Sequence, residues 1–179
     1  RNNNKVFIHR LIKTTGLTEA DLWEKVGSLE PINEKATIAS LPSYLGVRIR
    51  ISVLTESREE GETSLDEVQN FLEKQLTHYV YGKDEELLEE RVGDLLRKNS
   101  LTLATAESCT GGLIGHRLTQ VPGSSEYYKE GFVVYSNNAK TKSLKVDPGL
   151  IEEFGAVSEP VAKAMAQGVC HVTGADIGV

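Results

Sequence analysis

The sequence is poor in cysteine and histidine and lacks several common catalytic motifs. Its two cysteines, Cys109 and Cys170, form no Cys-x-x-Cys pair and predict no disulfide framework, so a reducing, cytoplasmic location is expected. Its four histidines have no zinc-ligand spacing among themselves or with the cysteines. The Gly-x-Gly-x-x-Gly fingerprint of dinucleotide-binding proteins and the Gly-Lys-Ser/Thr of a P-loop are both missing. No motif therefore indicates a zinc site or a P-loop.

Long apolar runs and an excess of positive charge are also lacking. No run approaches the roughly 20 apolar residues of a membrane-spanning helix, and no secretory signal pattern opens the chain. The net charge of −6 disfavours a broad surface for nucleic acid or membranes. Neither is expected as a direct partner.

The composition is that of a soluble globular protein. The 179 residues are 39% hydrophobic and 26% charged, which suffices for one large domain or two small ones. The chain opens on Arg1 without an initiator methionine, and residues 175–179 look like a strand that is just beginning. We therefore expect it to be a fragment of a longer protein.

The first half predicts a small α+β domain over residues 1–82. Residues 47–54 (VRIRISVL) alternate cleanly and predict a strand, and residues 5–12 are strand-like, although their pattern also fits a short helix. Thr18 and Asp21 form a capping pattern for a helix. A charged turn is expected over residues 56–62, followed by a helix capped by Ser64.

The second half, residues 83–179, alternates helices and strands and predicts a layered α/β domain that is unfinished at its C-terminal end. A helix is expected over about residues 85–98, and a buried strand from residue 101. A compact strand is expected over residues 132–135. Ser158 is expected to cap the last helix, with Pro160 in its first turn.

The chain is organised around residues 101–112 (LTLATAESCTGG), which predict a strand, a tight turn of small residues and the start of a helix. A helix start presents unpaired N–H groups to an anion, and glycines let the backbone approach a ligand closely. Ser108 lies where the strand gives way to the turn, so its hydroxyl can be presented above the sheet edge. The alternative is that Ser108 or Thr110 is only the N-cap of the helix.

Three candidate catalytic residues are expected at one edge of the sheet. Ser108 and Tyr135 lie at the carboxyl ends of predicted strands, where ligands bind in open α/β sheets, and Lys140 follows only five residues after Tyr135. A neutral lysine can activate a serine nucleophile, and a tyrosine between them can relay a proton. The Tyr-x-x-x-Lys spacing of short-chain dehydrogenases is exceeded by one residue. The alternative interpretation makes Tyr135 a half-buried strand residue and Lys140 a solvated helix lysine.

Four ordered blocks closely resemble the CinA C-terminal family, which includes the nicotinamide-nucleotide amidases. The blocks are residues 106–112 (AESCTGG), 123–125 (GSS), 131–140 (GFVVYSNNAK) and 155–161 (GAVSEPV). The upstream half resembles the KH-type segment that precedes this domain in CinA proteins, including residues 79–82 (YVYG) and 88–93 (LEERVG). That half has no Gly-x-x-Gly loop, so nucleic-acid binding is not inferred from it.

The resemblance implies hydrolysis of nicotinamide mononucleotide to nicotinate mononucleotide and ammonia, in pyridine-nucleotide salvage. It implies Ser108 as the nucleophile, with Lys140 and Tyr135 as its activating partners. Backbone N–H groups near the Gly turn are expected to hold either the oxyanion or the phosphate. The residues expected to bind the substrate are Cys109, Thr110, Gly111, Gly112 and Asn137. The resemblance implies no metal or other cofactor for the amidase.

The family's pattern also implies segments that this sequence lacks. They are a continuation of the amidase domain and an N-terminal molybdopterin-binding-like domain linked to ADP-ribose pyrophosphatase activity, for which a divalent metal is expected. A partial domain exposes a sheet edge, so self-association as a dimer is expected. Two alternatives stay open: a competence-associated, partner-binding fragment without activity, or part of an ADP-ribose pyrophosphatase whose active domain lies elsewhere.

Overall fold

A computed structural model of the chain describes residues 5–179, and it divides into two compact units between Leu88 and Glu89. The division expected from the sequence lay between residues 82 and 83. The first unit is a small α+β domain and the second is a layered α/β domain, so the predicted fold class is confirmed. Within the described residues, no helix is both long and apolar enough to cross a membrane.

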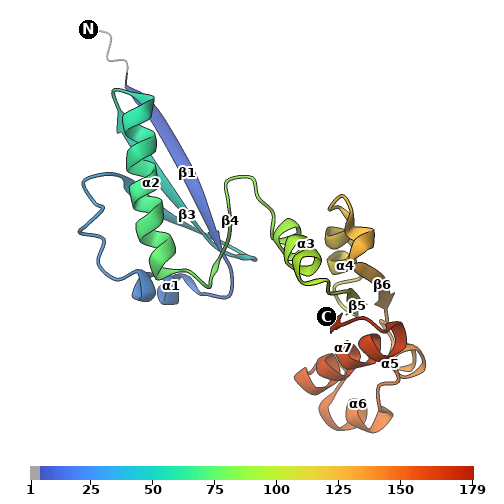
Figure 1. The fold of residues 1–179 in the computed structure, drawn as a ribbon. Coiled ribbons are helices and arrows are strands. Elements are labelled where there is room, and N and C mark those ends of the chain that lie inside the picture. Colours follow the sequence, from blue (N-terminus) through green and yellow to red (C-terminus); the bar gives the residue numbers. More distant parts are fainter. Residues whose placement is uncertain (1–4) are drawn as a thin grey trace. The chain divides into compact units, whose positions relative to one another are not determined.

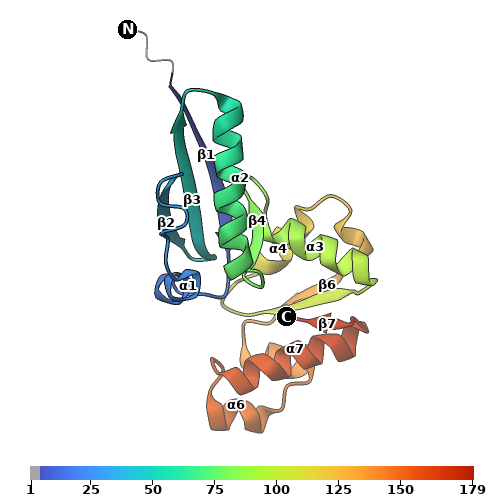
Figure 2. The same ribbon diagram turned by 60° about the vertical axis from the view of Figure 1, so that its left-hand side comes forward.

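The first unit is one antiparallel sheet with two helices (Figures 1 and 2). Its strands lie in the order β2-β3-β1-β4. The elements are β1 (Val6–Thr14), α1 (Glu19–Val26), β2 (Thr37–Ser43), β3 (Gly46–Thr55), α2 (Arg58–Gln75) and β4 (Val80–Lys83). The alternation predicted for residues 47–54 is confirmed, because Val47, Ile49, Ile51 and Val53 are buried in the core. The capping box of Thr18 and Asp21 is also present at the start of α1.

Helix α2 begins earlier than the sequence pattern predicted. Ser57 is its N-cap and accepts a hydrogen bond from the Glu60 N–H, so the expected charged turn and the Ser64 cap are wrong. Gly61, which looks like a turn residue in the sequence, is buried inside the helix. A Cβ atom there would lie 2.5 Å from Ile8 Cδ1, so this glycine lets α2 pack closely against β1.

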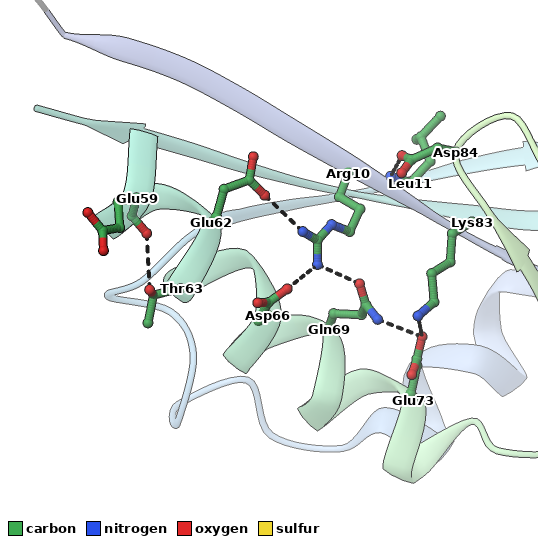
Figure 3. Close-up of polar contacts among 10 residues, drawn as sticks. All are labelled: Arg10, Leu11, Glu59, Glu62, Thr63, Asp66, Gln69, Glu73, Lys83 and Asp84. Carbon is green, nitrogen blue, oxygen red and sulfur yellow. Dashed lines mark hydrogen bonds and ion pairs between the residues drawn. The ribbon is translucent and has the colours of Figure 1, made fainter. Parts of the chain in front are cut away.

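Polar side chains of α2 form hydrogen bonds and ion pairs with residues of the sheet (Figure 3). The guanidinium of Arg10 on β1 donates hydrogen bonds to Asp66 at 2.6 Å, Gln69 at 2.7 Å and Glu62 at 2.9 Å. These partners lie on successive turns of one helix face. Arg10 therefore fixes how α2 lies on the strand.

The second unit is a three-stranded parallel sheet between two layers of helices. Its strands lie in the order β6-β5-β7. The elements are α3 (Leu88–Asn99), β5 (Leu103–Glu107), α4 (Leu113–Thr119), the short 3₁₀ helix η1 (Ser124–Glu126), β6 (Tyr128–Val133), α5 (Asn137–Leu144), α6 (Pro148–Phe154), α7 (Glu159–Thr173) and β7 (Ile177–Gly178).

The central strand β5 sends alternate residues into two separate cores. Leu103 packs with α3 and α4 in a cluster that includes Leu96, Leu118 and Tyr127. Ala104 packs on the other face with α5, α6 and α7. The carboxyl end of β5 therefore lies between the two helical layers, where a ligand site of an open α/β sheet is expected.

Two boundaries in this unit differ from the sequence prediction. Strand β6 covers Tyr128–Val133 rather than residues 132–135. Among the described residues it is an edge strand, in which Lys129, Glu130 and Gly131 are exposed, so it has no continuous apolar pattern. Ser158 occupies the N-cap position of α7, but its hydroxyl donates to the Gly155 carbonyl instead of accepting from the helix.

Candidate functional site

Ser108 is the first residue after β5, and its hydroxyl contacts the side chain of Lys140. The distance between Ser108 Oγ and Lys140 Nζ is 3.0 Å. Successive residues of a strand point to opposite faces of the sheet, so Ser108 faces α5 while Glu107 before it faces α4. The structure thus brings together two of the three predicted catalytic side chains.

Lys140 is fully buried, with 1% of its surface exposed. Its Nζ atom also donates to the backbone carbonyls of Val134 at 2.8 Å and Tyr135 at 3.0 Å. Ser136 caps α5 by accepting a hydrogen bond from the Ala139 N–H. That cap places Lys140 in the first turn of α5, beside the chain that leaves β6, so the solvated alternative for Lys140 is wrong.

The contacts of Lys140 hold its Nζ atom against the Ser108 hydroxyl. All three partners that the structure gives its Nζ atom are uncharged oxygens, and a buried charge without an opposite charge is unfavourable. Nζ donates to each of these oxygens, the Ser108 hydroxyl included. The pair can therefore act as a nucleophile and its general base.

The turn after Ser108 is stabilised by a backbone hydrogen bond and by two glycines in the left-handed conformation. Gly111 and Gly112 have φ values of 63° and 99°, in the left-handed region that favours glycine. The Gly111 N–H donates to the Ser108 carbonyl at 3.1 Å. Gly112 is the N-cap residue of α4, without a side-chain cap of its own. The alternative that Ser108 or Thr110 serves as this N-cap is therefore wrong.

Glu107 takes the place of the missing cap, a role that was not predicted from the sequence. Its carboxylate is 3% exposed and accepts hydrogen bonds from the N–H groups of Gly112 at 3.0 Å, Ile114 at 3.1 Å and Gly115 at 2.8 Å. The sequence carries no signal for this role, because Ser108 and Thr110 also fit an N-cap near the start of this helix.

The environment of Glu107 favours its ionised form. Burial by itself raises the pKa of the carboxyl, but hydrogen bonds from the backbone of Gly115, Ile114 and Gly112 and from the Thr110 side chain outweigh that effect. The net result is a pKa below the ordinary value of 4.5. An internal anion is therefore present at the start of α4 near neutral pH.

The Tyr135 side chain lies apart from the Ser108–Lys140 contact. The strand ends at Val133, so Tyr135 is not at a strand end as predicted, and 76% of its surface is exposed. Its carbonyl, rather than its phenol, contacts Lys140. A relay through a tyrosine between serine and lysine is not the observed geometry, because Ser108 and Lys140 touch directly.

The residues predicted to bind substrate line the exposed side of the turn and the start of α5. Cys109 and Thr110 are exposed, as is Asn137, the first residue of α5. Within residues 5–179, no acceptor is bonded to the backbone N–H of Cys109 or Thr110. In that same part of the chain, no three His, Cys, Asp or Glu side chains are grouped to hold a metal ion.

These features define a class: a two-domain mixed α/β protein with a serine–lysine pair at the carboxyl edge of its parallel sheet. The family of CinA C-terminal domains matches residues 85–179, and the KH domain of damage-inducible protein CinA matches residues 9–82. The chain belongs to the CinA family, so the predicted resemblance is confirmed.

Curated relatives match over almost the whole chain. A CinA-like protein of Chlorobium phaeobacteroides is 45% identical over 175 residues, which cover 97% of this chain and 42% of the relative. A CinA-like protein of Chloroherpeton thalassium is 41% identical over 179 residues, covering 99% and 43%. This chain thus spans about four-tenths of the length of these relatives.

Solved structures match one part of the chain. The competence/damage inducible protein CihA of Agrobacterium tumefaciens is 41% identical, with a TM-score of 0.48, over 49% of this chain and 53% of that chain.

Proposed function

We propose that this chain carries the active site of a nicotinamide-nucleotide amidase, which hydrolyses nicotinamide mononucleotide to nicotinate mononucleotide and ammonia. The observation that carries the proposal is the 3.0 Å contact between Ser108 Oγ and the buried Lys140 Nζ. Membership of the CinA family supports it through the resemblance of the four sequence blocks. The choice of substrate rests on that resemblance alone.

In the first half of the proposed reaction, Lys140 acts as base and then as acid. Its neutral amine takes the Ser108 hydroxyl proton while Oγ attacks the carboxamide carbon. The resulting oxyanion is held by the N–H groups of Cys109 and Thr110, which have no other acceptor among the described residues. The C–N bond then breaks, Lys140 returns its proton to the leaving nitrogen, and ammonia departs from an ester on Ser108.

In the second half, water replaces ammonia. Lys140 removes a proton from water, whose oxygen attacks the ester carbon. The bond between that carbon and Ser108 Oγ breaks, and the proton returns to the serine. The carbonyls of Val134 and Tyr135 hold Nζ in place throughout. The exposed Tyr135 phenol remains a proposed second proton donor to the leaving group, with Asn137 as a proposed substrate contact.

The test is ammonia release from nicotinamide mononucleotide, without added metal, by a protein that spans the full length of the curated relatives and contains this chain. We expect Ser108→Ala and Lys140→Met to abolish release. Lys142→Met removes an exposed lysine from the same helix and is expected to leave the rate unchanged. Absence of release by the unsubstituted protein would reject the amidase and favour a partner-binding role.

A further inference from the structure

The most fully bonded acidic group in the second unit lies next to the nucleophile. Both Glu107 carboxylate oxygens accept hydrogen bonds from the start of α4, with Oε2 bonded to Gly112 and Ile114 and Oε1 bonded to Gly115. The turn from Ser108 to Gly112 therefore closes around a fixed internal anion.

This anion changes what the glycine turn can bind. A helix start attracts a substrate phosphate through free N–H groups and the positive end of the dipole. Here the amides of Gly112, Ile114 and Gly115 already donate to a carboxylate. A phosphate at the same place would displace these bonds and meet a like charge. The amides of Cys109 and Thr110, earlier in the turn, stay available for an oxyanion.

The two side chains at the end of β5 are held from opposite faces. Glu107 is bonded to α4 on one side, and Ser108 is bonded to Lys140 of α5 on the other. Since the two residues are adjacent, movement of the Glu107 backbone also moves Ser108 and the following amide of Cys109. A displacement of about 1 Å in such a site can reduce the rate about 100-fold.

We propose that Glu107 is the positioning residue of this active site, holding the Ser108–Gly112 turn in its reactive shape and excluding the substrate phosphate from the start of α4. The inference rests on the proposed amidase function. It assigns the turn to the oxyanion and requires the phosphate of the nucleotide to bind elsewhere.

A first experiment tests the Glu107 carboxylate directly and does not depend on enzymatic activity. The backbone amide resonances of Gly112, Ile114 and Gly115 are followed by NMR in the 179-residue chain, first with inorganic phosphate and then as the pH is lowered. We expect no change with phosphate and a joint shift at a pH below 4.5, the ordinary pKa of the carboxyl. Shifts produced by phosphate near neutral pH would overturn the proposal.

Two other titratable groups are close enough to be considered in that titration. His116 of α4 and Tyr128 of β6 line, together with Glu107, an open cleft of about 300 Å³. Neither is a carboxylic acid, the class of side chain that takes up a proton in the acidic range. Glu107→Gln is therefore expected to abolish the joint acidic shift, and persistence of that shift would assign it to another group and overturn the proposal.

A second experiment separates positioning from folding. Glu107→Gln keeps the side-chain size but loses the charge, so we expect kcat for nicotinamide mononucleotide to fall about 10- to 100-fold, with KM changed less than about threefold. Glu89→Gln is the matched control, because Glu89 bonds to Arg117 away from the turn. An unchanged kcat in Glu107→Gln, or an equal loss in Glu89→Gln, would overturn the proposal. An inactive unsubstituted protein would instead reject the amidase, while the NMR experiment would still decide the role of the anion.

Discussion

The Nζ atom of Lys140 bonds to three oxygen atoms. Replacing Lys140 is therefore expected to lower the free energy of unfolding more than replacing Ser108 does. Lys140→Met leaves the carbonyls of Val134 and Tyr135 without their lysine donor, and the contact with Val134 is buried. An unsatisfied buried carbonyl costs about 1–3 kcal/mol. Ser108→Ala keeps both of those bonds. We expect both variants to lose activity, but only Lys140→Met to lose about 1–3 kcal/mol of stability in urea denaturation.

Equal stability of the two variants would contradict this account of the lysine. The exposed Lys142 on the same helix provides the control. Lys142→Met is expected to unfold within about 0.5 kcal/mol of the unsubstituted chain.

Glu107 predicts how the second unit responds to acid. Its pKa is lower in the folded state than the ordinary value of 4.5, so the unfolded state binds the proton more readily. The stabilisation is fully present above the unfolded pKa and is lost as the pH falls through the folded pKa. We expect the unfolding free energy of the second unit to fall below about pH 4.5, and Glu107→Gln to make that fall smaller.

The measurement is urea denaturation at a series of pH values between 7 and 3, followed by hydrogen exchange in residues 103–119. Glu89 also has a lowered pKa, caused chiefly by its hydrogen bond from Arg117, so the double variant Glu107→Gln with Glu89→Gln should show a smaller dependence still. An acid response of Glu107→Gln identical to that of the unsubstituted chain would exclude the carboxylate as its source.

At the scale of elements, the Tyr128 hydroxyl of β6 lies in the narrow space between β6 and α4. That hydroxyl bonds to Thr105 Oγ1 at 2.8 Å, and a Cβ atom added to Gly131 or Gly115 would lie 2.2 or 2.5 Å from it. We expect Gly131→Ala to destabilise the second unit by about 1–3 kcal/mol, the usual cost of overpacking. Tyr128→Phe removes the clashing oxygen and should relieve part of that loss.

A double-mutant cycle measures the relief by urea denaturation of the two single variants and the double variant. Tyr128→Phe alone is expected to cost about 1 kcal/mol through the lost hydrogen bond. The double variant should be more stable than the sum of the single effects predicts by at least about 0.5 kcal/mol. Strict additivity would show that the hydroxyl does not limit the space at Gly131.

Elements whose apolar residues recur at a regular spacing could be predicted from the sequence. Element boundaries that depend on contacts with other parts of the fold could not. The alternation in β3 follows from one buried face. The beginning of α2 was missed because Gly61 and its charged neighbours resemble a turn, although the glycine is needed for close packing on Ile8. Strand β6 was misplaced because an edge strand has one neighbour and keeps polar residues exposed.

The candidate site shows the same division. Ser108 and Lys140 could be selected because strand order and the family blocks place them at one sheet edge, and in the structure their side chains are in contact. Tyr135 was misplaced together with the end of β6. Glu107 was missed because its role depends on three backbone N–H groups that the sequence does not distinguish from other helix starts.

At the scale of the whole chain, each unit builds its core from its own residues. The first core includes Ile12, Ile49 and Leu72, and the second unit contains separate clusters on the two faces of its sheet. Such units are expected to unfold separately. The single tryptophan of the chain, Trp23, packs against the first core, so its fluorescence should report the first unit alone.

Ile49→Ala tests this independence. Ile49 is completely buried, and its truncation should cost the first unit about 2–5 kcal/mol through lost burial and a residual cavity. We expect the Trp23 unfolding midpoint in urea to fall while hydrogen exchange in β5 keeps its midpoint. Val169→Ala, at a fully buried position in the second unit, should produce the reverse. If either substitution moved both midpoints equally, the units would unfold as one, and the Ser108–Lys140 site would depend on the first unit for its stability.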